Sequence, residues 1–170
     1  MGTGTWTVSG QSTYTGATAV NLGTRKLGAT GGATNTPFGT NAGGVAVYSG
    51  AVLDFNGFTI PTTEALTING RGISDGGALI GSTGTFGGTI AQGTDSRITN
   101  ASGTMTITGA VSGAFLLYVG GAGNITTSAV FPAVALGITK QGAGTLTVTG
   151  ANLYTGATRV EAGTFAYAGT

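Results

Sequence analysis

Large apolar residues recur along this chain at a nearly constant interval, and this period constrains the fold more than any other feature of the sequence. A period of roughly 20 residues is one that solenoid repeats use. A β-sandwich does not give such registry, because its strands recur roughly every 8–12 residues. A parallel β-helix does, since each coil is one period and like residues stack on like. The members of this row are Trp6, Leu66, Phe86, Met105, Ile125, Leu146 and Phe165.

Small residues fill most positions between these large ones. The 170 residues include 35 Gly, 33 Thr and 23 Ala, and apolar residues alternate with Thr in short segments such as 145–148. Gly costs roughly 1 kcal/mol more than Ala inside a helix and Thr is stiff at χ1, so both disfavour helix. The sequence therefore predicts an all-β protein. It is expected to be a single-stranded parallel β-helix (β-solenoid) of about eight coils of ~20 residues, with Gly and Ala at the corners and Thr outside.

The composition excludes several classes of function. Charged residues make up 6% of the chain, the net charge is +1 and the six bases are scattered, so no basic stripe is available for nucleic acid. The chain has no Cys and no His, and therefore lacks thiolate ligands and the commonest general base. No apolar run approaches ~18 residues, which a membrane-spanning helix needs. We expect a protein that is not an enzyme, with no catalytic residue, metal or cofactor.

The two ends of the chain carry copies of one motif. Residues 2–24 and 142–164 are identical at 14 of 23 positions, and both contain G-x-G-T-x-T-V followed by Y-T-G-A-T. The C-terminal copy closely resembles the autotransporter-associated β-strand repeat, which reads approximately G-x-G-T-L-T-L-T-G-x-N-x-Y-x-G-x-T-x-V-x-x-G-T-L. The N-terminal copy departs from that pattern in having Trp6 for Leu and Ser12 for Asn.

This resemblance implies a right-handed parallel β-helix that is exported as the passenger of a bacterial autotransporter and displayed outside the cell. Proteins with this repeat are mostly large surface or secreted proteins, often adhesive or structural. We therefore expect an extracellular rod at the bacterial surface, with a host surface or a glycan as its ligand. No signal peptide precedes the repeat and the chain stops within a repeat, so we expect a segment of a longer protein or a subunit that assembles.

Residues 1–170 are expected to form one solenoid domain. Residues 28–44 are expected to protrude as a loop, because this segment holds one large apolar residue, Phe38, among Gly, Asn and Pro. Neither terminus resembles a cap, and an uncapped solenoid leaves unpaired strand edges. A head-to-tail contact between such ends does not close and gives a fibre, so the sequence predicts end-to-end self-association.

Two other classes of function stay open. Asp54, Asp75 and Asp95 are each about one period apart, so stacking would align them as a carboxylate ladder, as a carbohydrate-active enzyme or a metal site requires. The alternative is that all three are turn residues, which Asp favours. A face with Thr in regular rows would order water and bind ice, but the coils near Leu66 and Ile125 lack paired threonines. The pairs are Thr5 with Thr7, Thr83 with Thr85, Thr104 with Thr106 and Thr145 with Thr147.

Overall fold

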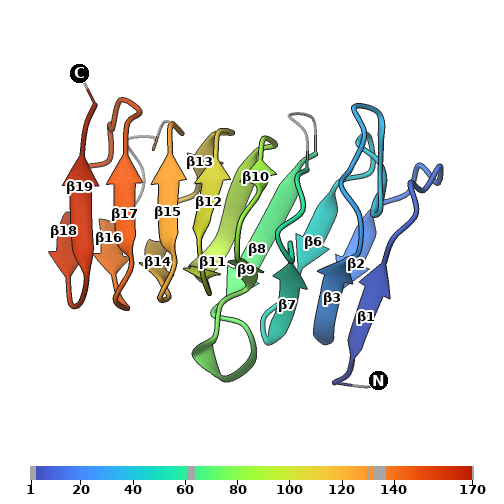
Figure 1. The fold of residues 1–170 in the computed structure, drawn as a ribbon, viewed down its shortest axis with the longest axis horizontal. Helices are drawn as coiled ribbons and strands as arrows, with labels where there is room; N and C mark the ends of the chain where they lie inside the picture. Colours follow the sequence, from blue (N-terminus) through green and yellow to red (C-terminus); the bar gives the residue numbers. More distant parts are fainter. Residues whose placement is uncertain (1–2, 61–63, 130, 132–136, 170) are drawn as a thin grey trace.

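The computed structural model describes residues 3–60, 64–129, 131 and 137–169. Within them the chain forms strands β1 to β19 and one short 3-10 helix, η1 (Ile73–Asp75). The strands stack as a β-solenoid of about seven turns, ~21 residues apart. The all-β parallel β-helix is therefore confirmed, with slightly fewer and longer coils than the predicted eight. Figure 1 shows the coils stacked along the long axis, with the two termini at opposite ends.

Two sheets form the walls of the solenoid. The larger one has two branches that meet in the long strand β11 (Ile90–Asn100). The C-terminal part of β11 pairs with strands of the first branch, and its N-terminal part pairs with strands of the second branch. The first branch contains β1 (Thr5–Val8), β3 (Gly23–Leu27), β7 (Ala51–Asp54), β9 (Leu79–Gly81), β11, β14 (Leu116–Gly120), β16 (Gly137–Lys140) and β18 (Ala157–Val160). The second branch contains β2 (Thr18–Val20), β6 (Val45–Val47), β8 (Leu66–Gly70), β11 and β13 (Val111–Ser112).

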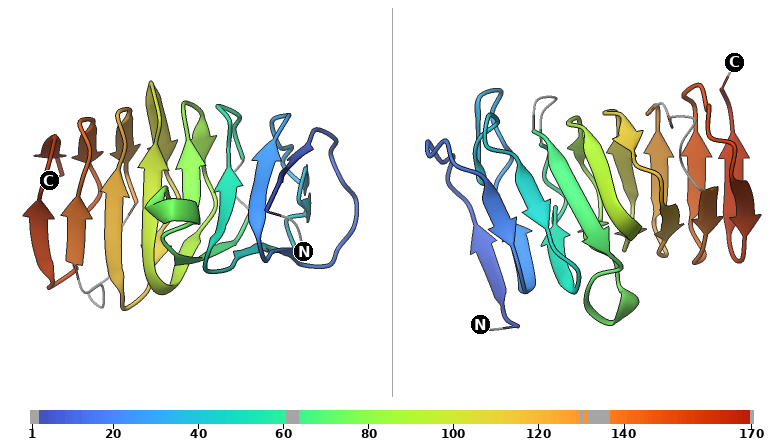
Figure 2. Two further views of the ribbon diagram at one scale, coloured as in Figure 1. Left: turned by 90° about the horizontal axis from the view of Figure 1, so that it is seen from below. Right: turned by 180° about the vertical axis from the view of Figure 1, so that it is seen from behind.

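A separate five-stranded sheet covers another side of the coils, as the views in Figure 2 show. In the coils from β10 to β14, for example, the chain passes from this sheet through the second branch to the first branch and back. Parallel pairing of this kind requires the chain to make a full turn between partners, which is the reason for the long spacing between them. The sheet consists of β10 (Thr85–Phe86), β12 (Thr104–Ile107), β15 (Asn124–Thr127), β17 (Thr145–Val148) and β19 (Thr164–Tyr167).

Inward-facing residues of the first branch are joined by in-register pairing into one continuous column, which we call the first-branch column. Its central members are buried, and Leu79 for example is 0% exposed. Its two end members are open to solvent, with Trp6 67% and Val160 50% exposed. The core is therefore a narrow stack that is closed along its sides and open at both ends. The column consists of Trp6, Arg25, Leu53, Leu79, Ile98, Val119, Lys140 and Val160.

The predicted row of large apolar residues is correct in its C-terminal half and wrong in its N-terminal half. Phe86 pairs with Ile107 rather than with Met105. Leu66 belongs to the second branch, and Trp6 belongs to the first. Every wall of the solenoid needs the same alternation of a large inward residue and a small outward one, so spacing alone does not tell the walls apart. The members that do stack in register are Met105, Ile125, Leu146 and Phe165.

The two copies of the repeat motif fold in the same local way but on different walls. Residues 5–8 form β1 in the first branch, whereas residues 145–148 form β17 in the five-stranded sheet. Both copies nevertheless make the same hydrogen bond between a tyrosine and the threonine four residues after it. It joins Tyr14 to Thr18 at 2.6 Å and Tyr154 to Thr158 at 2.5 Å. The motif thus fixes a local turn and strand geometry and not a particular wall.

Residues 28–44, the segment expected to protrude, contain an antiparallel pair of short strands, β4 (Asn35–Thr36) and β5 (Gly39–Thr40). Its one large apolar residue, Phe38, is 1% exposed and belongs to the hydrophobic core. The hydroxyl of Thr36 donates a hydrogen bond of 2.9 Å to the carboxyl group of Glu64, which is itself buried. The hairpin is therefore fastened to the coils by an apolar anchor and a buried polar contact.

Burial raises the pKa of Glu64, and the hydroxyl of Thr36 lowers it by less. A carboxyl group whose folded pKa is raised keeps its stability contribution below its unfolded pKa and loses it as the pH rises through the folded value. We expect Glu64→Gln to abolish this loss, so that its free energy of unfolding exceeds that of the parent protein increasingly as the pH rises to neutral. Urea unfolding at several pH values measures this, and Glu161→Gln at an exposed site is the control. A constant difference between Glu64→Gln and the parent would contradict the prediction.

Candidate functional site

The structure does not bring the three aspartates of the predicted ladder together. Asp54 pairs in register with Ile80, because residues 71–77 leave the coil as a loop and carry Asp75 out of the stack. The carboxylate of Asp95 accepts a hydrogen bond from the backbone N–H of Leu116. Across the described ranges, no group of three or more His, Cys, Asp or Glu residues is placed to hold a metal ion. The prediction that the three aspartates stack as a ladder is therefore wrong, and each carboxylate has a separate partner.

The loop at 71–77 forms a polar cluster on the outside of the first branch, which the sequence did not reveal. The guanidinium of Arg71 lies 4.0 Å from the ring centroid of Tyr118. Asp75 forms ion pairs with both Arg71 and Arg97, the latter at 2.9 Å. Ser74 and Asp75 both have positive φ, at 49° and 63°. Because the ion pairs and the ring contact link the loop to two different coils, the cluster holds a strained insertion against the sheet.

Threonines line the outside of the five-stranded sheet in two columns. The coil at Ile125 was expected to interrupt them, yet Thr126 continues one column in register. Thr5 and Thr7 were expected in the same face but lie on β1 in the other sheet. Asn124 interrupts one column of threonines and Ala166 ends the other. Ice binding stays a prediction. One column contains Thr85, Thr106, Thr126, Thr147 and Ala166, and the other contains Thr104, Asn124, Thr145 and Thr164.

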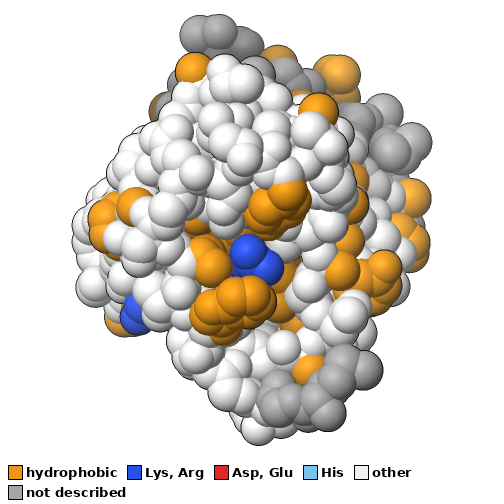
Figure 3. Space-filling model, turned by 90° about the vertical axis from the view of Figure 1, so that its right-hand side faces the viewer, with side chains coloured by type: hydrophobic (Ala, Val, Ile, Leu, Met, Phe, Trp, Pro, Cys, Tyr) orange, Lys and Arg blue, Asp and Glu red, His pale blue; other side chains and the backbone are white. Residues whose placement is uncertain are grey.

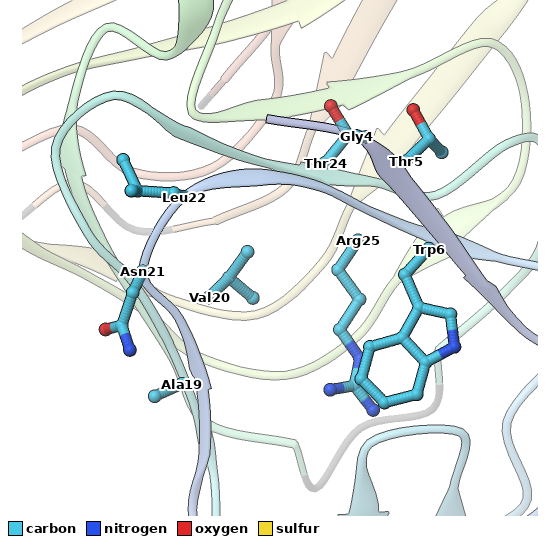
Figure 4. A pocket seen from close by; sticks show the side chains of 9 residues that line it. All are labelled: Gly4, Thr5, Trp6, Ala19, Val20, Asn21, Leu22, Thr24 and Arg25. Atoms are coloured by element: carbon cyan, nitrogen blue, oxygen red, sulfur yellow. The ribbon is translucent and has the colours of Figure 1, made fainter. Parts of the chain in front are cut away.

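The N-terminal end of the solenoid is an open cleft. In the described part of the chain β1 pairs only with β3 and β2 only with β6, so one edge of each strand is unpaired. Figure 3 shows this end with a basic side chain exposed among hydrophobic ones. The cleft has a volume of about 380 Å³. It is lined by Gly4, Thr5, Trp6, Ala19, Val20, Asn21, Leu22, Thr24 and Arg25 (Figure 4).

Arg25 is the basic group of this cleft, and it is held by aromatic rings. Its guanidinium lies 4.9 Å from the ring centroid of Trp6 and 5.4 Å from that of Phe38, and it donates a hydrogen bond of 3.4 Å to the hydroxyl of Tyr14. Figure 4 shows the guanidinium beside the indole ring. Cation–π contacts of this kind stabilise a guanidinium whose charge is partly removed from water. Trp6 thus covers the guanidinium of Arg25, which is the next member of the first-branch column.

The C-terminal end is open in the same way. Of the described strands, β18 pairs only with β16 and β19 only with β17. Large hydrophobic residues with exposed side chains concentrate at the two ends, since all of those in the described ranges except Tyr48 and Ile73 lie in the first or last coil. These end residues are Trp6, Tyr14, Leu22, Leu153, Val160 and Tyr167. Exposed apolar patches of this kind mark interaction surfaces.

Lys140 is a buried member of the first-branch column, next to its C-terminal end. Its ammonium donates hydrogen bonds to the carbonyl oxygens of Gln141 at 2.6 Å, Gly142 at 2.7 Å and Ala162 at 3.2 Å. Burial lowers the pKa of this group. Three carbonyl acceptors match the three N–H donors of an ammonium, and they belong to the corners of two successive coils. Lys140 therefore fastens the last coil to the one before it.

We expect Lys140→Met to lower the free energy of unfolding by about 1–3 kcal/mol, because it leaves the corner carbonyls without donors. Lys26→Met is the control, since Lys26 is 35% exposed and makes a longer ion pair with Asp54 at 3.5 Å. A solvent-accessible pair of that kind contributes about 0–1 kcal/mol. Chemical unfolding followed by circular dichroism compares the two variants. Equal losses would show that the carbonyl contacts of Lys140 are not stabilising.

These features define a class of protein: a β-solenoid whose parallel strands stack coil on coil around a buried apolar core. Residues 1–24 and 138–166 match the family model described as the passenger-associated-transport-repeat. The two ends of the chain are therefore similar to a passenger repeat, which confirms the resemblance seen in the sequence. No curated protein and no solved structure matches the chain significantly. In the described residues, no helix is both long and apolar enough to cross a membrane.

Proposed function

We propose that this chain is a non-catalytic rod segment of a bacterial autotransporter passenger, displayed outside the cell, with a structural or adhesive role and with end-to-end self-association. The passenger repeat and the solenoid fold support the rod. The observation that carries the proposal is the in-register stacking of the coils along the first-branch column, a parallel pairing that a further coil can continue. Solenoids whose ends are left uncapped expose both apolar surface and backbone hydrogen-bonding groups.

The side walls favour a passive rod over a catalytic one. The acids of the described chain are spread along it: Asp54 pairs with Lys26, Asp75 with two arginines and Glu161 with Arg159. A glycosidase would instead place two carboxyl groups across one cleft. A host surface or a glycan is the ligand class we propose for the adhesive role. The polar cluster around Arg71 and Tyr118 is the part of the wall that most favours such a contact, because it combines an aromatic ring with hydrogen-bond donors.

End-to-end association is tested by analytical ultracentrifugation and negative-stain electron microscopy over a range of micromolar concentrations. We expect particles one solenoid wide whose length grows with concentration. Val160→Lys, which places a charge at the open C-terminal end, is expected to abolish the growth. Tyr48→Lys is the matched control, because both side chains are 50% exposed but Tyr48 lies on the side of the rod. A monomer at tens of micromolar would overturn the self-association.

A further inference from the structure

We infer that Asn56 is a site of spontaneous deamidation, and that loss of its side-chain amide releases a contact between two successive coils. Asn56 and Gly57 form the tip of the turn that follows β7, and their φ angles are 48° and 80°. Across this turn the N–H of Phe58 donates a hydrogen bond of 2.8 Å to the carbonyl oxygen of Phe55. Positive φ at both central residues is the pattern of a type I′ turn, which favours an Asn-Gly pair.

The reaction needs only this pair of residues and water. The backbone nitrogen of Gly57 attacks the carbon Cγ of Asn56, so that a new C–N bond forms and the bond from Cγ to Nδ2 breaks. The proton of the backbone nitrogen leaves with the amide group as ammonia. Water then opens the resulting succinimide at one of its two carbonyl groups, which gives an aspartyl or an isoaspartyl residue, and nothing is oxidised or reduced. The nucleophile and the carbon that it attacks belong to neighbouring residues, so the first step is intramolecular. Glycine offers no Cβ to obstruct the approach.

A second Asn-Gly pair, Asn69–Gly70, is an internal comparison because its nucleophile is engaged. The N–H of Gly70 donates a hydrogen bond of 2.7 Å to the hydroxyl oxygen of Thr94. Among the described residues the N–H of Gly57 makes no hydrogen bond. Asn56 is also exposed, whereas Asn69 is half-buried at the end of β8. The fold therefore favours reaction at Asn56.

The amide of Asn56 connects its coil to the coil before it. Its Nδ2 donates a hydrogen bond of 3.1 Å to the carbonyl oxygen of Leu27. A carboxylate has no N–H to donate, so deamidation leaves two acceptors facing each other. The new negative charge also lies close to Asp54, whose carboxylate accepts a hydrogen bond of 2.7 Å from the backbone N–H of Asn56. Both changes weaken the contact between the two coils.

Peptide mapping by mass spectrometry tests the site, after the folded protein has been kept for days in mildly alkaline buffer. We expect the deamidated fraction at Asn56 to rise several times faster than that at Asn69, with isoaspartate among the products. In urea, where the N–H groups of both glycines are open to water, we expect the two rates to converge. Absence of deamidation at Asn56, or a rate no higher than at Asn69, would overturn the inference. A rate difference that persisted in urea would overturn the assignment of the difference to the fold.

Thr94→Val tests the protection of the second pair, because it removes the acceptor of the Gly70 N–H and keeps the shape of the side chain. We expect this variant to deamidate faster at Asn69 and at an unchanged rate at Asn56. An unchanged rate at Asn69 would overturn the role given to the free N–H.

Asn56→Asp tests the release of the coil contact directly, since it is one product of the reaction. We expect a lower midpoint of urea unfolding than in the parent protein. Asn21→Asp is the matched control, because Asn21 is exposed and its side chain makes no hydrogen bond among the described residues, so this variant adds the same charge without removing a contact. We expect its midpoint to stay near that of the parent. Equal midpoints for the two variants would overturn the release of the contact.

Discussion

A Gly121→Ala substitution is expected to lower the free energy of unfolding by about 4 kcal/mol or more, a loss of the size that marks a specific structural conflict. Gly121 has φ +106°, and a Cβ atom there would overlap the carbonyl group of Asn100 in the preceding coil. The neighbour is backbone and belongs to a hydrogen-bonded corner, so it has little room to yield. Urea unfolding followed by far-UV circular dichroism measures the loss, which appears as a lower midpoint or an unfolded protein.

Gly50→Ala separates the effect of coil stacking from that of the backbone angle. Gly50 also has positive φ, at +83°, but nothing lies within 4 Å of the position where a Cβ would stand. Its substitution is expected to cost only the backbone strain, about 1–2 kcal/mol. Equal losses in the two variants would contradict the view that the close approach of successive coils, rather than positive φ, requires glycine at the corner.

The walls of the solenoid could be predicted from the sequence, but their identity could not. Period and alternation are local properties of the chain, so the stack from Met105 to Phe165 was correct. Assigning Trp6 and Leu66 to the right wall needs the lengths of the intervening loops, and these vary in the N-terminal half. The insertion at 71–77, for example, moves Ile80 and not Asp75 into register with Asp54. A fixed step along the chain cannot represent that change.

The polar cluster of Arg71, Asp75, Arg97 and Tyr118 could not be predicted from the sequence, because its members come from a loop and two separate coils. The one available signal was that Arg71 and Arg97 each lie within a few residues of an aspartate in the sequence.

Two of the basic residues occupy equivalent positions in the fold, which the sequence did not show. They seemed scattered, yet Arg25 and Lys140 each occupy the second position from one end of the same inward column. The two charges have different partners: the rings of Trp6 and Phe38 lie beside the partly exposed guanidinium of Arg25, and corner carbonyls accept hydrogen bonds from the buried ammonium of Lys140. Because both lie one coil from an end, the apolar part of the column is confined between them.

Phe86→Ala is expected to cost about 3–5 kcal/mol, the range for removing a buried aromatic ring. Phe86 is 1% exposed and stacks on Phe55 with 5.1 Å between ring centroids, in the middle of the rod. Phe165→Ala is the control: this ring belongs to the last coil and is only partly buried, so its removal is expected to cost less than half as much. Because each coil contacts only its neighbours, a central cavity weakens two interfaces and a terminal one weakens one. Urea unfolding at a concentration where the protein is monomeric compares the variants. An equal cost for Phe165→Ala would contradict the open C-terminal end.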